Sequence, residues 1–243
     1  MQKITDEFIR THFTEDAIEN GMHLYEGAIE AALYIEKLCD NNDSDTYYCD
    51  EYFDTYISSI LGKRQGEYTV QDYCALPDDV RFELIDGVLI YMNSPHINHQ
   101  FISGEIFRQL SNFIHDNKGK CKVFYAPVDV ILDKDDKTCV QPDIGIFCDN
   151  NLISDKGTLY GAPDFVLEII SKSTSQKDYK LKLNKYKNAG VREYWIVDPY
   201  KEKVLVYFFE NDINPTIYPI DAEIPIRIYE GNLNIVCNLQ GEK

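Results

Sequence analysis

Two acidic residues lie in apolar segments where an isolated carboxylate would be costly. Asp143 follows Pro142 and opens the apolar run 144–147, and Glu168 lies inside the apolar run 165–170. Burial of a carboxylate is unfavourable unless it is paired or bound to a cation, and two carboxylates on neighbouring strands would also repel each other. A divalent cation removes both costs, and oxygen ligands suit Mg²⁺ or Mn²⁺. The pair therefore predicts a metal-assisted site.

Each acid also has a purely structural interpretation. Asp143 could cap a turn, and Glu168 could pair with a buried lysine or arginine without doing any chemistry. Either residue alone is a weak signal. The two together, at the start of one apolar strand and in the middle of another, favour the metal site.

A lysine on the following helix is the third candidate. Lys182 lies four residues after Asp178 and four residues before Tyr186, so the three side chains share one helix face. The alternative is a solvent-facing ion pair between Lys182 and Asp178. Tyr179 and Leu183 mark a buried side nearby, from which Lys182 could instead reach inward.

Five motifs occur in a fixed order: RFELIDGVLIYMNSPHINHQ at 81–100, QPDIGIF at 141–147, GAPDFVLEIISKST at 161–174, the spacing from Asp178 to Tyr186, and AGVREYWIVDP at 189–199. Together they resemble the Uma-two family, which belongs to the PD-(D/E)XK nuclease superfamily. The resemblance covers about residues 66–210. It implies a nuclease fold and a Mg²⁺-dependent activity on nucleic acid.

The resemblance also implies a role for each matching residue. Asp143 and Glu168 match the two acids of the motif and would hold the metal ion. Ile170 stands where the superfamily has its lysine, and the matching lysine is Lys182 on the next helix. For His99 the alternative is an ordinary polar residue at a helix start. The remaining implied residues are the metal ligands Glu83 and the backbone carbonyl of Ile169, and the accessory residues His99, Asp178 and Tyr186.

The surrounding sequence supplies the elements that must position these residues. Thr69 to Asp72 is a capping box opening a short helix, and Asp86-Gly87 predicts a tight turn between two strands. Gly190 is predicted to end the second of two longer helices. The predicted helices are at about 98–115 and 176–188, and the predicted strands are at 82–85, 88–92, 122–132, 143–147, 165–170, 193–197, 204–209 and 224–229. This alternation predicts an α/β (α+β) domain, and the resemblance implies a restriction-endonuclease-like mixed sheet flanked by helices.

Residues 1–65 are predicted to be an acidic helical extension of a nuclease-like domain at 66–243. Thr14 predicts a helix N-cap, followed by an apolar stripe to Ala32, and a second short helix is predicted at about 49–61. Residues 1–60 hold 14 acidic and 3 basic residues, a net charge of −11. The extension could bind a protein partner, shield the substrate cleft or present a solvated face.

The whole chain carries a net charge of −17, which is the wrong sign for a protein that contacts phosphates. Carboxylates that hold a cation lose their mutual repulsion, which reduces this objection without removing it. The seven cysteines are scattered, with no C-x-x-C pair, and predict reduced thiols rather than a disulfide framework or a zinc site. No apolar run is typical of a signal peptide or long enough to span a bilayer. A soluble cytoplasmic protein with no membrane partner is therefore expected.

The predicted function is divalent-metal-dependent hydrolysis of phosphodiester bonds, with DNA as the expected substrate. The alternative is a nuclease-fold protein that binds nucleic acid or a protein partner without cutting, which the acidic composition favours. The sequence distinguishes neither DNA from RNA nor one metal ion from two. The oligomeric state also stays open, although nucleases that cut both strands often act as homodimers.

Overall fold

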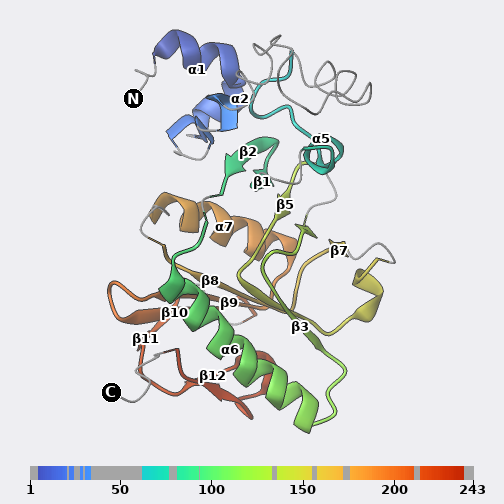
Figure 1. Ribbon diagram of the computed structural model, residues 1–243, viewed down its shortest axis with the longest axis vertical. Coiled ribbons are helices and arrows are strands. Elements are labelled where there is room, and N and C mark those ends of the chain that lie inside the picture. The colour runs from blue at the N-terminus through green and yellow to red at the C-terminus, as the bar shows by residue number, and fades with distance from the viewer. Residues whose placement is uncertain are drawn as a thin grey trace. The chain divides into compact units, whose positions relative to one another are not determined.

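The computed structural model of the chain forms two compact units (Figure 1). The first comprises residues 1–93 and 133–140, and the second comprises residues 94–132 and 141–243. The described residues are 5–20, 22–24, 28–29, 31–33, 62–76, 81–92, 94–132, 136–154, 158–171, 176–210 and 214–237, with side chains omitted at 176–180. No helix within these ranges has both the length and the apolar character needed to cross a membrane.

The first unit begins with short helices rather than one long one. They are α1 (Asp6–His12), α2 (Glu15–Glu19) and the 3-10 helix η1 (Met22–Leu24). The Thr14 hydroxyl accepts the N–H of Ala17, which confirms the predicted N-cap. The predicted continuous stripe is interrupted after Glu19, however, where α2 ends. The helix predicted at about 49–61 lies outside the described residues, and the domain boundary predicted at residue 65 stays a prediction.

The same unit contains the predicted hairpin. The hairpin consists of the antiparallel strands β1 (Phe82–Ile85) and β2 (Val88–Tyr91). The unit also contains the capped helix α5 (Val70–Cys74) and the strand β5 (Cys139–Val140), which is antiparallel to β1. Thr69 and Asp72 form both hydrogen bonds of the predicted capping box. Asp86 and Gly87 have φ angles of 52° and 75°, as a two-residue turn with two left-handed positions requires.

A buried glutamine ties the N-terminal segment to this hairpin. The Gln65 amide donates to the carbonyls of Ala28 at 3.1 Å and Leu89 at 3.0 Å, and its oxygen accepts the N–H of Leu89 at 2.7 Å. All the polar atoms of this buried side chain are therefore satisfied, as burial requires.

The second unit is built on a six-stranded mixed sheet. Its strands are β3 (Lys122–Tyr125), β6 (Ile144–Phe147), β8 (Phe165–Ile169), β9 (Glu193–Asp198), β10 (Lys203–Phe208) and β11 (Thr216–Pro219). They are ordered β11-β10-β9-β8-β6-β3. Only β8 and β9 run parallel, and the other neighbours are antiparallel. This arrangement confirms the predicted mixed sheet.

Helices cover both faces of this sheet (Figure 1). On one face, α6 (Ile97–Asp116) buries the stripe Ile102, Ile106 and Leu110 in a core that includes Trp195. Phe101 lies outside this stripe, about 100° around the helix from Ile102, and is 60% exposed. On the other face, Tyr186 of α7 (Gln176–Ala189) packs against Tyr194. Gly190 follows α7 with a φ of 101°, as predicted for a C′ glycine.

Two predicted strands are shorter than expected. The run 122–132 divides after β3 at Pro127, which has no N–H for a sheet hydrogen bond, and continues as a separate short strand. The run 224–229 ends as a strand at Pro225. The remaining short elements are β4 (Val130–Ile131), which pairs with β7 (Leu159–Tyr160), β12 (Ile224–Pro225), which pairs with β13 (Asn234–Ile235), and the 3-10 helices η2 (Asn150–Leu152) and η3 (Arg227–Tyr229).

A buried carboxylate explains why η3 replaces a strand. Glu193 Oε2 accepts the N–H groups of Arg227 at 2.8 Å and Ile228 at 2.9 Å, and Oε1 accepts the indole N–H of Trp195 at 2.7 Å. The Glu193 side chain therefore occupies the backbone N–H groups at the start of η3. These N–H groups are then not available to pair with a neighbouring strand. Burial raises the pKa of Glu193 from 4.5 to about 7, and the hydrogen bonds from Ile228, Trp195 and Arg227 oppose this rise only in part.

The stability of the protein should consequently fall as Glu193 ionises. Its pKa is higher in the folded than in the unfolded chain, so its stabilising contribution is complete below about pH 4.5 and is lost as the pH rises through about 7. Relative to Glu193→Gln, the unfolding free energy of the wild type should decrease by about 3 kcal/mol between about pH 5 and pH 8. Urea unfolding across this range measures the difference. The exposed control Glu223→Gln should follow the wild type, and parallel curves for wild type and Glu193→Gln would contradict the assignment.

The expectation of reduced thiols is wrong for one pair of cysteines. Cys121 and Cys148 form a disulfide with a Cα–Cα distance of 3.9 Å. They are 27 residues apart, so their spacing gave no signal. They meet because β3 and β6 pair in the register Lys122 with Phe147, which places Cys121 opposite Cys148.

Candidate active site

The strand register brings the two predicted acids together. β6 and β8 are antiparallel and pair Ile144 with Leu167, so the next pair in the register is Asp143 with Glu168. Directly opposed residues of antiparallel strands point to the same face, with Cβ atoms about 5 Å apart. Phe165, Leu167 and the other odd-numbered positions of β8 face the α6 core. Glu168 therefore faces the side of the sheet on which α7 lies.

Asp143 is held by one backbone and one side-chain donor. Its Oδ2 accepts the N–H of Ile169 at 2.7 Å and lies 3.0 Å from His99 Nε2. A carboxylate that is ionised can only accept hydrogen bonds, so in that state the Nε2–H of His99 would be the donor of this contact. Both side chains are nearly buried, with 11% of His99 and 14% of Asp143 exposed. His99 therefore contacts Asp143 directly, and its accessory role stays a prediction.

Glu168 is held by the two α7 residues predicted from their spacing. Its Oε1 accepts the Tyr186 hydroxyl at 2.7 Å and the Lys182 ammonium at 3.0 Å. Lys182 is only 12% exposed and Glu168 only 8% exposed, so this lysine points inward and not into solvent. A positive charge and a neutral donor on one oxygen offset the cost of burying this carboxylate.

The other predicted site residues are placed less completely. Glu83 is buried on β1 in the first unit, and its role as a further metal ligand stays a prediction. Asp178 lies in the part of α7 whose side chains are not described, so its accessory role also stays a prediction. Ile169 contributes its N–H to Asp143, whereas its carbonyl remains a predicted metal ligand.

Asp129 is a further carboxylate close to the start of β6, and no motif in the sequence indicated it. Gln141 is two residues before Asp143, and its buried amide donates to Asp129 Oδ1 at 3.0 Å. Asp129 lies between β3 and β4, in a segment predicted as one continuous strand. The break at Pro127 and the following turn of the chain place it beside Gln141, and neither is visible from apolar periodicity.

The Tyr186 hydroxyl should contribute measurably to stability because it is fully buried and donates to a carboxylate. Hydrogen bonds to charged groups contribute about 1.5–3 kcal/mol, so Tyr186→Phe should lower the unfolding free energy by that amount in urea titrations. The matched control is Tyr125→Phe, since Tyr125 is 56% exposed, and it should change stability little. Equal stability of the Tyr186→Phe variant and the wild type would show that this hydroxyl does not anchor Glu168.

Comparisons with known proteins identify a family and a similar fold. The family model Uma2, described as "putative restriction endonuclease", matches residues 70–223. A crystal structure of a putative nuclease from Anabaena variabilis has a similar fold, with a TM-score of 0.58 and 21% sequence identity, over 70% of this chain and 94% of that one. At this identity the likeness concerns the fold alone. Among curated proteins, none matches the chain.

Proposed function

The chain belongs to the Uma2 family, and we propose that it is a divalent-metal-dependent endonuclease that hydrolyses phosphodiester bonds in DNA. One observation carries the proposal. Asp143 and Glu168 are opposed across β6 and β8, and the Lys182 ammonium lies 3.0 Å from Glu168. Two acids and a lysine on the same face of a sheet form a compact set for phosphoryl chemistry.

The donor set fits a hard cation that prefers oxygen ligands, such as Mg²⁺ or Mn²⁺, better than a softer metal such as Zn²⁺ or Cu²⁺. Within the described residues, no group of three or more His, Cys, Asp and Glu side chains could hold a metal ion. Mg²⁺ is commonly bound through one or two carboxylates and keeps several waters that substrate phosphates can replace. Asp143 and Glu168 would supply these carboxylates, with the Ile169 carbonyl and Glu83 as further proposed ligands. When bound, the cation polarises a phosphoryl oxygen and acidifies water.

The protein residues would divide the remaining tasks. Hydrolysis forms a bond from water oxygen to phosphorus, breaks the bond to the leaving oxygen and moves one proton from water to that oxygen. Lys182 would donate hydrogen bonds to oxygens on which negative charge develops. Tyr186 and His99 would position Glu168 and Asp143 through the hydrogen bonds described above.

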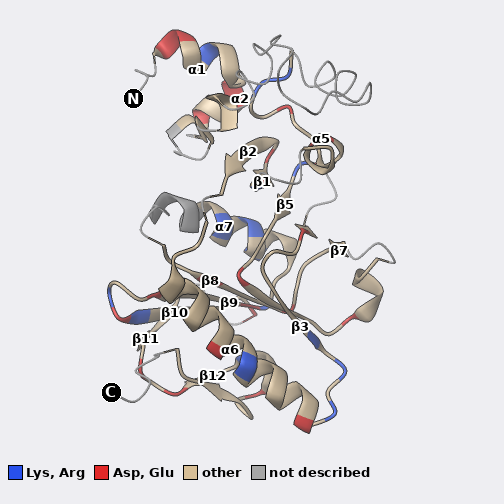
Figure 2. Ribbon diagram, viewed as in Figure 1, with Lys and Arg blue, Asp and Glu red and all other residues tan. Residues whose placement is uncertain are grey.

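A local excess of lysine supports a phosphate-containing substrate despite the acidic chain. Residues 171–190 contain six lysines and one acidic residue, and Figure 2 shows the ribbon coloured blue for basic residues along the described part of α7. Lysines near a cleavage site reduce the repulsion between phosphates and an acidic protein. The net charge of −17 favours the second candidate function, a nuclease-fold protein that binds nucleic acid or a protein without cutting. A homodimer and a protein partner for residues 1–65 also remain proposals.

Cleavage of supercoiled plasmid tests the proposal. The wild type should nick the plasmid in Mg²⁺ or Mn²⁺ and lose this activity in EDTA, and parallel reactions with single-stranded DNA and RNA identify the substrate class. Absence of cleavage on every substrate, together with no Mg²⁺ binding in calorimetry, would favour the binding protein. Metal binding without cleavage would indicate a substrate other than those tested.

A further inference from the structure

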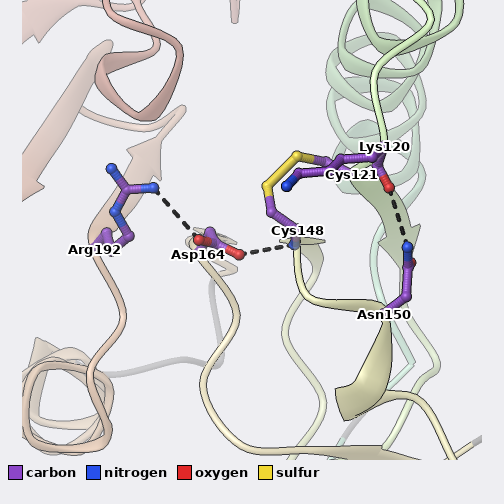
Figure 3. Close-up of a disulfide and its surroundings, with 6 residues drawn as sticks. All are labelled: Lys120, Cys121, Cys148, Asn150, Asp164 and Arg192. Carbon is purple, nitrogen blue, oxygen red and sulfur yellow. Dashed lines mark hydrogen bonds and ion pairs between the residues drawn. A yellow bond between two sulfur atoms is a disulfide. The ribbon is translucent and has the colours of Figure 1, made fainter.

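We propose that Cys121 and Cys148 form a thiol–disulfide exchange site for small disulfides of the glutathione class, with Cys121 as the attacking thiol and Cys148 as the resolving thiol. The pair lies across the ends of β3 and β6 (Figure 3). It uses no residue of the proposed active site.

The two cysteines are held opposite each other by contacts that do not depend on the sulfur–sulfur bond. β3 and β6 share four residue pairs, and the rings of Phe124 and Phe147 are in contact with centroids 5.5 Å apart. Beyond the strands, the Asn150 amide donates to the Lys120 carbonyl at 3.5 Å (Figure 3). Reduced thiols would therefore remain adjacent. Once reduced, such a pair should close readily, since closing it costs little further chain entropy.

Reagents in solution can reach this pair. Cys121 and Cys148 are both partly exposed, whereas Cys139 and Cys237 are buried. Burial also raises the pKa of Cys237 to about 12, which disfavours its reactive thiolate. Cys121 and Cys148 therefore combine partial exposure with a bonded partner thiol.

The surrounding charges differ for the two sulfurs and assign the order of attack. Cys121 lies between Lys120 and Lys122, which are both exposed, and nearby lysines stabilise a thiolate and attract anionic disulfides such as oxidised glutathione. By contrast, Cys148 is followed by Asp149, and its N–H donates to Asp164 Oδ2 at 2.8 Å (Figure 3). These carboxylates disfavour negative charge on Cys148, and the ion pair of Asp164 with Arg192 at 3.4 Å offsets part of this effect (Figure 3). The Cys121 thiolate should therefore react first.

The exchange balances in two steps. The Cys121 thiolate attacks one sulfur of oxidised glutathione, which forms a mixed disulfide and releases one glutathione thiolate. The Cys148 thiolate then attacks Cys121 Sγ, which closes the intramolecular disulfide and releases the second thiolate. Two protein thiols lose two electrons, oxidised glutathione gains them, and the two thiol protons go to the departing glutathione thiolates.

The first test is an equilibrium titration of the full-length wild type. The protein is incubated at graded ratios of reduced to oxidised glutathione, quenched in acid and alkylated, and the 121–148 linkage is quantified by mass spectrometry. A reversible transition that is the same from either direction is expected. A linkage that stays closed across the series, or one that never forms, would overturn the proposal. These measurements need neither nucleic acid nor metal, so their outcome is independent of the proposed nuclease activity.

Single variants test the order of attack. With oxidised glutathione, Cys148→Ser should accumulate a mixed disulfide on Cys121 about three- to tenfold faster than Cys121→Ser forms one on Cys148. The reverse preference would overturn the assignment of the attacking thiol. The exposed Cys74 provides the control, since Cys74→Ser should leave the 121–148 titration unchanged.

Thermal unfolding measures the consequence for the fold. A cross-link that closes a loop of this length should raise the melting temperature of the oxidised protein above that of the reduced protein by about 5–10 °C. The double variant Cys121→Ser/Cys148→Ser should melt at one temperature in both redox buffers. An equal redox shift in this double variant would assign the effect to other cysteines and contradict the proposal.

Discussion

Asp143→Asn and Glu168→Gln should each lower the rate of metal-dependent plasmid nicking by about 10³-fold or more. A bound cation contributes several kcal/mol of charge stabilisation to phosphoryl transfer, and about 4 kcal/mol corresponds to 10³ in rate. Each substitution replaces a proposed charged ligand by a neutral amide of the same shape. The asparagine oxygen can still accept the N–H of Ile169, so the hydrogen bond that Asp143 makes to β8 is retained. Initial rates at saturating Mg²⁺ measure the effect.

The matched control for these variants is Asp116→Asn, because Asp116 is exposed at the end of α6 and outside the proposed site. It should cleave at the wild-type rate. Calorimetry should show weaker Mg²⁺ binding by both active-site variants, and thermal unfolding should show that they remain folded. A folded Asp143→Asn variant that cleaves within about tenfold of the wild type would exclude Asp143 as a required metal ligand.

Lys182→Met should lower the cleavage rate by about 10²–10³-fold, the usual effect of removing one donor to a developing negative charge. Methionine keeps the length of the aliphatic stem but removes the ammonium group that lies 3.0 Å from Glu168 Oε1. Glu168 keeps the hydrogen bond from Tyr186, so a carboxylate remains available to Mg²⁺. The expected signature is therefore a lower rate at saturating DNA with metal affinity largely retained. Single-turnover kinetics and calorimetry measure the two quantities separately.

The same helix provides a control for Lys182→Met. Lys187 is exposed in the last turn of α7, so Lys187→Met removes the same charge without touching Glu168. At saturating DNA it should retain the wild-type rate. Equal losses in the two variants would mean that α7 acts through its overall charge on DNA binding, and Lys182 would then have no specific role in the chemical step.

The sequence separation between two site residues decided whether their contact could be predicted. Lys182 and Tyr186 share a helix face because of the fixed i, i+4 geometry of a helix, and both reach Glu168 from there. The contact between His99 and Asp143 spans 44 residues and depends on where α6 packs on the sheet. The motif identified His99, but only the packing gave it a partner.

Strand positions show the same division between local and long-range information. Alternating and continuous apolar runs located β6, β8, β9 and β10, since side-chain facing follows from the period of a strand. Register between strands is set by tertiary packing. The strand register places Asp143 opposite Glu168 and Cys121 opposite Cys148. The two cysteines are 27 residues apart in the sequence, and nothing in that spacing indicated that they would pair.

The amino-acid sequence by itself determined the identity of the acids and the lysine, the helices and strands that carry most of them, and the turns at Asp86-Gly87 and Gly190. These features rest on backbone preferences and on short-range periodicity, which act within a few residues. The tertiary structure alone decided the disulfide, the inward position of Lys182, the contact between Asp129 and Gln141, and the 3-10 helix held by Glu193. Each of these depends on burial and on the register of distant strands, because a buried polar group takes the partner that the fold brings to it.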